Sequence, residues 1–520
     1  MPKHLSKFIR RRAAVYALLV GPAVLLPLQG CTDLTETPRD SLTPNNTFRT
    51  SGEIQAGVAA VYAQLRSTLW AYYNLSEVTT DEQIVPTRGN DWFDNGRWLE
   101  IHRLGYSPTS GSGLDDINAL WNDTFTGISR ANLVINAIEN NNVAGQEGVI
   151  AELRVLRAWY YYILMDGFGG VPIVTTTEVA ERARDSRAEV FAFVEKELTE
   201  ARPALPAAKY SPGNAGYGRV TQSVADAILA NMYLNAREFT AEPTATGLTL
   251  GAQQYQKAID AANRVINSGQ YSLATDSASW RSNFATVNEG APENIFVVRH
   301  VAQPGLGETL PMRVLHYNQL DPAPWNGFAI TAEAYNKFDA ADARRSIFLV
   351  GPQVSFVNGQ PVNDRTGQRL NYTVTINNPN SATEAEGVRL LKYPPLSGAP
   401  EGNHPNDYAF FRLAEMYMIR AEANHRLGNS GAALADLNLL RARVFATPKP
   451  LAAVTDDVLL NERLFEFAGE GKRRQDLIRF GRFTAPRQFK PTATEPFKVL
   501  FPIPVTQLGT NPLLEQNPGY

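Results

Sequence analysis

Much of the chain consists of helix-length segments in which apolar residues recur every three or four positions. The first carries them at Ile54, Val58, Val61 and Leu65. This spacing predicts an amphipathic helix with one buried face. The same pattern predicts helices over residues 117–139, 151–166, 187–201, 222–237, 253–267, 410–427, 430–444 and 457–480. The sequence lacks the alternation of strands and helices that a parallel sheet requires, so we expect a mainly α fold.

Weak internal repetition refines this expectation. Ala158 with Tyr161, and Ala230 with Tyr233, place a small residue three positions before an aromatic one, as tetratricopeptide repeats do. Residues 417–437 contain the best copy. Residues 285–320 and 347–405 are rich in Gly, Pro and Asn with short β-prone runs. We therefore predict a tetratricopeptide-like helical-repeat scaffold with long ordered loops and small β elements.

The N-terminus has the features of a secretion signal that ends in a lipid attachment site. Five basic residues between Lys3 and Arg12 precede an apolar run over residues 13–28, which is too short to span a bilayer comfortably. The only cysteine, Cys31, follows directly after Gly30. We expect a lipoprotein signal peptide over residues 1–30, lipidation of Cys31, and a polar tether over residues 31–50. The alternative is a free thiol beside a cleaved signal.

Charge and cysteine usage exclude some classes of protein. Removal of residues 1–30 takes away five of the 49 basic side chains and none of the 52 acidic ones. A mildly acidic mature chain does not fit a nucleic-acid ligand, which requires a basic surface. Disulfides cannot stabilise a fold with one cysteine, so a hydrophobic core must do so.

Several motifs occur in order along the chain. They are residues 153–162 followed by Phe168-Gly169-Gly170-Val171-Pro172, then residues 218–221, 265–271, 411–417 with 421–423, 461–463, 470–479, 501–504 and 517–520. Together they resemble the SusD/RagB family of nutrient-binding outer-membrane lipoproteins. The resemblance implies an N-terminal helical region over residues 51–240 and a C-terminal region with ligand loops over residues 241–520. It also implies a SusC-like TonB-dependent outer-membrane transporter as the partner.

The charged residues of the C-terminal motifs alternate in sign at helical spacings: Glu462, Glu466, Glu470, Arg473, Arg474, Asp476 and Arg479. Opposite charges three or four positions apart pair on a helix, so we interpret these residues as structural ties and not as catalytic groups. We expect Arg412 and Glu415 to connect helices in the same way.

Signatures of catalysis and of cofactor binding are missing from the sequence. The six histidines have no paired spacing suited to a metal, and residues 469–472 lack the first glycine of a phosphate loop. No Gly-x-Ser-x-Gly elbow occurs. We expect no catalytic residue, no metal and no cofactor, although a pair of carboxylates for glycoside hydrolysis could be hidden among the acidic residues.

Aromatic residues in polar, loop-like segments are the candidate ligand contacts. Flat rings cover the apolar face of a sugar while amides and acids bind its hydroxyl groups. Residues 88–98 and 317–327 have this composition, and the candidates are Asn90, Asp91, Trp92, Trp98, Tyr317, Trp325 and Asn326. Packing of the three tryptophans against their own scaffold is the alternative. Trp70, Trp121, Trp159 and Trp280 fall in or beside helices and are expected in the core.

The predicted function is nutrient binding, with oligosaccharide as the first choice, and delivery to the transporter. The predicted location is the outer membrane, with the protein lipid-anchored and exposed at the surface. Three alternatives remain at this point: a binder of peptide or another nutrient, a tetratricopeptide-like envelope assembly lipoprotein, and a surface glycosidase.

Overall fold

The structure of the protein is a computed structural model that describes residues 47–109 and 112–520. The predicted signal peptide, Cys31 and nearly all of the tether lie outside these residues. No helix within the described ranges is long and apolar enough to cross a membrane.

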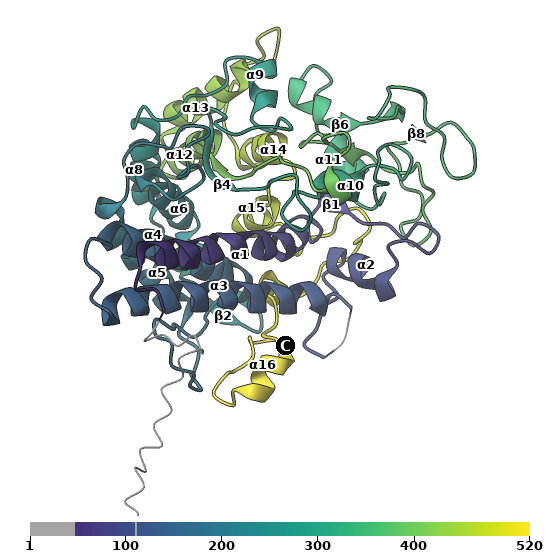
Figure 1. The fold of residues 1–520 in the computed structure, drawn as a ribbon. Helices are drawn as coiled ribbons and strands as arrows, with labels where there is room; N and C mark the ends of the chain where they lie inside the picture. Colours follow the sequence, from purple (N-terminus) through teal and green to yellow (C-terminus); the bar gives the residue numbers. More distant parts are fainter. Residues whose placement is uncertain (1–46, 110–111) are drawn as a thin grey trace, which may run out of the picture. The chain divides into compact units, whose positions relative to one another are not determined.

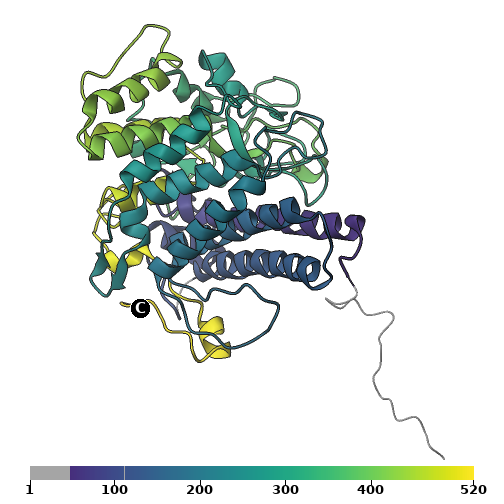
Figure 2. The same cartoon turned by 90° about the vertical axis from the view of Figure 1, so that its left-hand side faces the viewer.

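Long helices pack in successive pairs. α1 (Ser51–Glu77) packs on α3 (Leu114–Asn140), α4 (Glu147–Phe168) on α5 (Arg187–Ala201), α6 (Gln222–Leu234) on α8 (Tyr255–Ile266), and α12 (Leu413–Arg426) on α13 (Ser430–Ala442). Contacts of α3 with α4 and of α8 with α12 join these pairs. Figures 1 and 2 show the resulting layers of helices. The prediction of a mainly α, tetratricopeptide-like scaffold is confirmed.

Local sequence explains where several of these helices begin. Thr50 and Glu53 form a capping box at the start of α1, in which each side chain accepts a backbone N–H of the other residue. Ser186 and Glu189 do the same at the start of α5. These side chains satisfy amides that the first helical turn leaves without partners.

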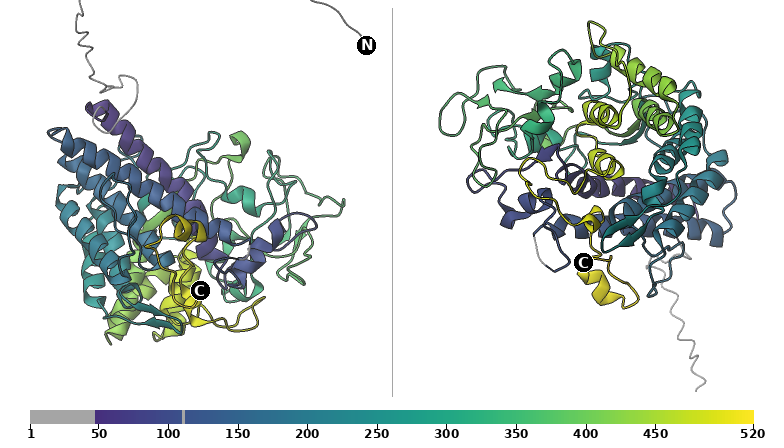
Figure 3. Two further views of the ribbon diagram at one scale, coloured as in Figure 1. Left: turned by 90° about the horizontal axis from the view of Figure 1, so that it is seen from below. Right: turned by 180° about the vertical axis from the view of Figure 1, so that it is seen from behind.

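Shorter helices and two-stranded antiparallel sheets lie mostly in the long loops. The helices are α2 (Arg97–His102), α7 (Ala236–Phe239), α9 (Ser277–Ser282), α10 (Leu310–Val314), α11 (Ala332–Tyr335), α14 (Asp456–Phe467), α15 (Arg473–Arg479) and α16 (Val505–Thr510). The strand pairs are β1 (Gln83–Ile84) with β5 (Ala329–Ile330), β2 (Glu242–Thr244) with β3 (Gly247–Thr249), β4 (Asn294–Val298) with β10 (Tyr408–Arg412), β6 (Phe348–Leu349) with β9 (Arg389–Leu390), and β7 (Gly351–Pro352) with β8 (Asn371–Tyr372). Figure 3 shows that the loops around β6 and β8 lie on the side away from the paired helices.

Two predicted helices differ clearly from the structure, while the others agree with it or differ by a few residues at their ends. Residues 410–412 belong to β10, because their backbone pairs with β4, and the helix begins only at Leu413. A short run of apolar residues fits a buried strand as well as a helix, so periodicity could not separate the two. The helix predicted over residues 457–480 is divided into α14 and α15. Gly469 and Gly471 between them have φ values of 73° and 70°, which an α-helix does not accept.

The charged C-terminal motifs form buried ion pairs, which confirms their structural role but places them inside the protein and not on a helix surface. Arg412 Nη1 donates to Glu466 Oε1 at 2.7 Å, and its Nε donates to Glu470 Oε2 at 2.8 Å. Lys472 lies 3.0 Å from Glu415. The network ties β10 and α12 to α14 and to the glycine turn that follows it.

Candidate ligand-binding site

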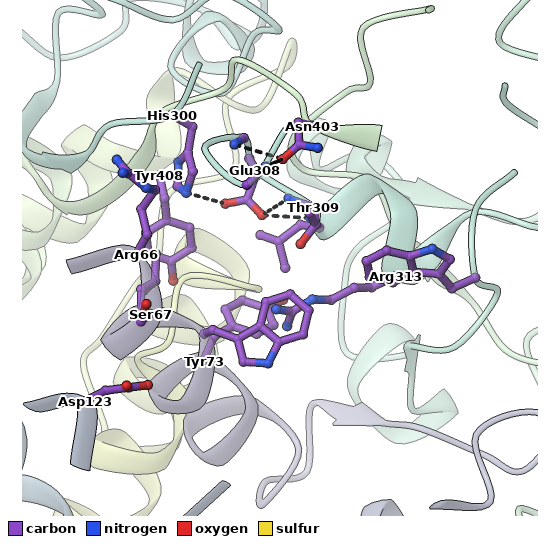
Figure 4. A pocket seen from close by; sticks show the side chains of 16 residues that line it. Arg66, Ser67, Tyr73, Asp123, His300, Glu308, Thr309, Arg313, Asn403 and Tyr408 are labelled. Carbon is purple, nitrogen blue, oxygen red and sulfur yellow. Dashed lines mark hydrogen bonds and ion pairs between the residues drawn. The ribbon is translucent and has the colours of Figure 1, made fainter. Parts of the chain in front are cut away.

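A pocket of about 480 Å³ opens between α1, α3 and the loop that leads into α10. The described residues that line it are Arg66, Ser67, Leu69, Trp70, Tyr73, Asp123, His300, Gly305, Gly307, Glu308, Thr309, Leu310, Arg313, Trp325, Asn403 and Tyr408. Figure 4 shows the polar side chains around this space. Its volume falls within the range of small-molecule sites.

Trp70 is the first of two exposed indoles at this pocket. Its side chain is 40% exposed, so the prediction that Trp70 belongs to the core is wrong. The guanidinium of Arg313 lies 3.1 Å from the centre of the indole, and Arg313 also donates to Asn74 Oδ1 at 2.8 Å. A cation held over an indole face is attracted by the ring's quadrupole. Arg313 therefore fixes Trp70 in its exposed position.

The helical register contains a signal that could have found Trp70. Leu65 is buried on the core face of α1, and five residues at 3.6 per turn rotate the next position by about 140°. Trp70 therefore points away from the buried face of α1 that carries Leu65. Trp121, Trp159 and Trp280 are buried, which confirms their prediction as core residues.

Trp325 is the second exposed indole, with 36% of its side chain accessible. The indole N–H of Trp92 donates to the backbone oxygen of Trp325 at 2.5 Å. Trp92 can approach this closely because Gly327 has no side chain, and a Cβ there would lie 2.3 Å from the Trp92 ring. Residues 88–98 and 317–327, which are far apart in the sequence, thus lie side by side.

Trp98 and Asn326 do not line the pocket but lie next to Trp92 and Trp325 respectively. Trp98 is buried, packs edge-on against Trp92 with ring centroids 5.5 Å apart, and donates its indole N–H to Asp94 at 2.6 Å. Asn326 is also buried; its amide donates to the Glu384 backbone oxygen at 3.1 Å. Both side chains are occupied within the protein.

Asp91 and Tyr317 form a clasp with Arg365 beside Trp92. The Tyr317 hydroxyl donates to Asp91 Oδ2 at 2.6 Å, and Arg365 donates to the same oxygen at 2.8 Å. The Tyr317 hydrogen bond, together with Arg365, lowers the pKa of Asp91, so this carboxylate stays ionised at neutral pH. Asn90 lies on the exposed turn next to the clasp.

Glu308 and Asn403 hold the loop on the far side of the pocket. Glu308 Oε1 accepts the backbone N–H groups of Thr309 and Leu310, both at 2.7 Å. Asn403 Oδ1 accepts those of Gly305 and Gly307, both at 3.1 Å. Figure 4 shows these contacts. The loop therefore has a fixed shape before any ligand arrives.

His300 lies close to Glu308, with Nε2 3.9 Å from Glu308 Oε2. Burial lowers the pKa of His300, which keeps the imidazole neutral at pH 7. Within residues 47–109 and 112–520, no group of three or more His, Cys, Asp and Glu side chains could hold a metal ion.

The pocket suits binding. Two rigid indoles come from separate segments, and hydrogen-bonding groups from Ser67, Asp123, Thr309 and other residues lie between or beside them. A helical scaffold that presents such a pocket on ordered loops defines a ligand-binding protein.

Comparison with known proteins gives the family. A model described as "SusD family" matches residues 251–520, and one described as "Starch-binding associating with outer membrane" matches residues 41–234. The chain therefore belongs to the SusD family, as its motifs indicated, and is a binding protein and not an enzyme. The division of the chain at residue 240 remains a prediction.

Relatives cover nearly the whole chain. It is 26% identical to the starch-binding protein SusD of Bacteroides thetaiotaomicron over 86% of this chain and 85% of that one. It is 24% identical to SusD-like protein P2 of Formosa agariphila, over 96% and 98% of the two chains.

Solved structures share the fold. A SusD-like protein of Bacteroides fragilis superposes with a TM-score of 0.74 at 20% identity, covering 92% of this chain and all of that one. Surface glycan-binding protein A of Bacteroides thetaiotaomicron, in complex with laminarihexaose, superposes with a TM-score of 0.70 at 22% identity, covering 90% of this chain and all of that one.

Proposed function

We propose that the protein captures an oligosaccharide at the outer-membrane surface in the pocket between Trp70 and Trp325. The observation that carries the proposal is the pair of exposed indoles, 40% and 36% accessible, at the edge of a pocket of about 480 Å³. An indole covers the apolar face of a pyranose ring, so two indoles would bind two sugar residues of one chain. The names of the starch-binding and laminarihexaose-bound relatives support this ligand class.

Polar groups of the pocket would bind the sugar hydroxyls. Asp123 is only partly buried and faces the space from α3. Ser67 is exposed on α1, three positions before Trp70. Asn90, Asp91, Trp92 and Tyr317 would extend the surface beyond Trp325, with Trp98 and Asn326 as its support.

We further propose that the protein acts next to a SusC-like TonB-dependent transporter, to which it delivers the oligosaccharide. Lipid on Cys31 would hold the chain at the membrane, where each buried methylene contributes about 0.8 kcal/mol. Family membership and the model description "associating with outer membrane" support this setting.

Calorimetric titration of the protein with laminari- and malto-oligosaccharides tests the binding proposal. Trp70→Ala and Trp325→Ala should each weaken binding by about tenfold, because stacked aromatic contacts contribute about 0.5–1.5 kcal/mol beyond the area they bury. Leu439→Ala is the control, since Leu439 is 47% exposed on α13, outside the pocket lining. A peptide mixture titrated in parallel identifies the other nutrient class. Unchanged glycan affinity in both tryptophan variants would refute this pocket.

The transporter proposal has its own test. The tagged protein is purified in mild detergent from native outer membranes, and mass spectrometry identifies what accompanies it. A stoichiometric β-barrel with a TonB box is the expected result, whereas recovery with assembly factors alone would contradict delivery to a transporter.

A further inference from the structure

A second hollow of about 290 Å³ adjoins the aromatic pocket and shares Arg66 with it. Its walls come from α1, from the turn at residues 215–219 and from the end of β4. Three arginines line it, namely Arg66, Arg219 and Arg299. The proposed sugar-binding function assigns no role to this hollow.

Arg66 stands between the two spaces without a carboxylate partner. Its Nη1 donates to the backbone oxygen of Arg299 at 3.3 Å, and no ion pair links it to an acid of the described residues. Burial lowers the pKa of Arg66, although a guanidinium stays charged at any physiological pH. Figure 4 shows its charged end on the side of His300, away from Asp123. Arg66 therefore keeps donors without an acidic partner, as far as the structure describes the chain, in the wall that the two spaces share.

Arg299 is held beside Arg66 in a fixed position. Its aliphatic stem packs on Gly218, where an added Cβ would lie 2.7 Å from the Arg299 Cδ. Its guanidinium lies 5.0 Å from the centre of the Tyr217 ring. Its Nη2 forms an ion pair with Glu289 Oε1 at 3.7 Å, a separation too long for a hydrogen bond. The side chain is 42% exposed, so its donors reach solvent.

Arg219 differs from these two because its charge is already neutralised. Its Nε donates to Glu152 Oε1 at 2.7 Å, and its Nη2 pairs with the second oxygen of the same carboxylate. Glu308, an acid of the aromatic pocket, accepts the backbone N–H groups of Thr309 and Leu310 with its Oε1. Arg66, which has no acidic partner among the described residues, and Arg299, whose ion pair with Glu289 is long, both line the hollow and thus remain available for an anion.

We infer that Arg66 and Arg299 bind an oxyanion substituent of the captured glycan, so that the ligand is an acidic oligosaccharide bearing a carboxylate or a sulfate ester. This inference rests on the proposed binding of sugar rings at Trp70 and Trp325. A guanidinium presents parallel N–H donors that match the two oxygens of either group, and partial burial strengthens the contact. The shared position of Arg66 lets one ligand contact both spaces.

Matched acidic and neutral glycans test the inference by calorimetry. Oligogalacturonate is compared with its methyl ester, and a sulfated carrageenan oligosaccharide with its desulfated form. We expect the wild-type protein to bind at least one acidic member more tightly than its neutral match. The pair that shows the preference identifies the anion as carboxylate or sulfate.

The variants Arg66→Gln and Arg299→Gln show whether the tighter binding of the acidic glycan depends on these two arginines. Each should weaken the acidic ligand about tenfold and reduce the salt dependence of binding, while the neutral match changes less than about twofold. Arg482→Gln is the control, because Arg482 is 59% exposed and pairs only with exposed Asp457 in the described structure. Circular dichroism confirms that each variant is folded.

The outcomes separate this inference from the proposed function. Equal affinity of the wild-type protein for acidic and neutral glycans overturns the arginine site and leaves sugar capture intact. An acidic preference that survives both arginine substitutions also overturns it. Failure to bind any glycan removes both proposals.

Discussion

Replacement of Glu466 by glutamine should destabilise the fold strongly, because this carboxylate has arginines on several sides. Its Oε1 accepts Arg412 at 2.7 Å and also pairs with Arg443, while its Oε2 lies 3.2 Å from Arg344. Its side chain has no solvent exposure. Burial by itself raises the pKa of Glu466, but the three guanidiniums outweigh it and hold the pKa well below 4.5.

The expected loss in the free energy of unfolding depends on which acidic partners the arginines keep when Glu466 is replaced. Removal of one partner of a buried ion pair costs about 3–5 kcal/mol, since the other charge stays buried without compensation. Arg412 keeps Glu470 at 2.8 Å, and Arg344 keeps Asp342 at 2.6 Å. Because those partners remain, we expect the lower end, about 3 kcal/mol, for Glu466→Gln.

Urea unfolding followed by circular dichroism measures this difference. Glu178→Gln is the matched control, since Glu178 is 74% exposed and lies 3.8 Å from Arg182, and such surface pairs contribute about 0–1 kcal/mol. If Glu466→Gln changed the free energy of unfolding by less than about 1 kcal/mol at an unchanged denaturant slope, the structural role given to this network would be refuted.

Three further predictions concern other parts of the molecule. Arg313→Met removes the cation stacked on Trp70 and should weaken oligosaccharide binding about three- to tenfold in calorimetry; unchanged affinity would contradict the positioning role. Burial raises the pKa of both Glu77 and Glu82, the latter to about 7. The proton on Glu82 therefore contributes stability that is fully present below about pH 4.5 and is lost as pH rises to about 7. The melting temperature should therefore fall between about pH 5 and pH 7, and Glu77→Gln should flatten this slope; an equal slope in both proteins would count against the pair. Gly471→Ala forces a side chain into φ of 70° and should cost about 1 kcal/mol or more in thermal unfolding, and an unchanged melting temperature would exclude that strain.

Part of the candidate site could be predicted from the sequence. The mixture of aromatic and polar residues in two loops predicted a ligand surface, and the structure places Trp92 against Trp325 and Asp91 against Tyr317. The local composition could not predict which of these aromatic side chains are exposed. Trp98 has the same local composition as Trp92 but is buried, because burial depends on which distant segment covers each ring.

Local sequence by itself determined most of the long helices, since periodic apolar spacing and capping residues act within a few positions of the chain. It also determined the family, through ordered motifs. Only the tertiary structure decided that residues 410–412 pair as a strand, and that Trp70 and Trp325 meet at one pocket. The same holds for the partners of Arg66 and Glu466. These features depend on contacts between different segments, from 23 positions apart for Arg443 and Glu466 to 233 for Arg66 and Arg299, and the spacing of residues within one segment carries no information about them.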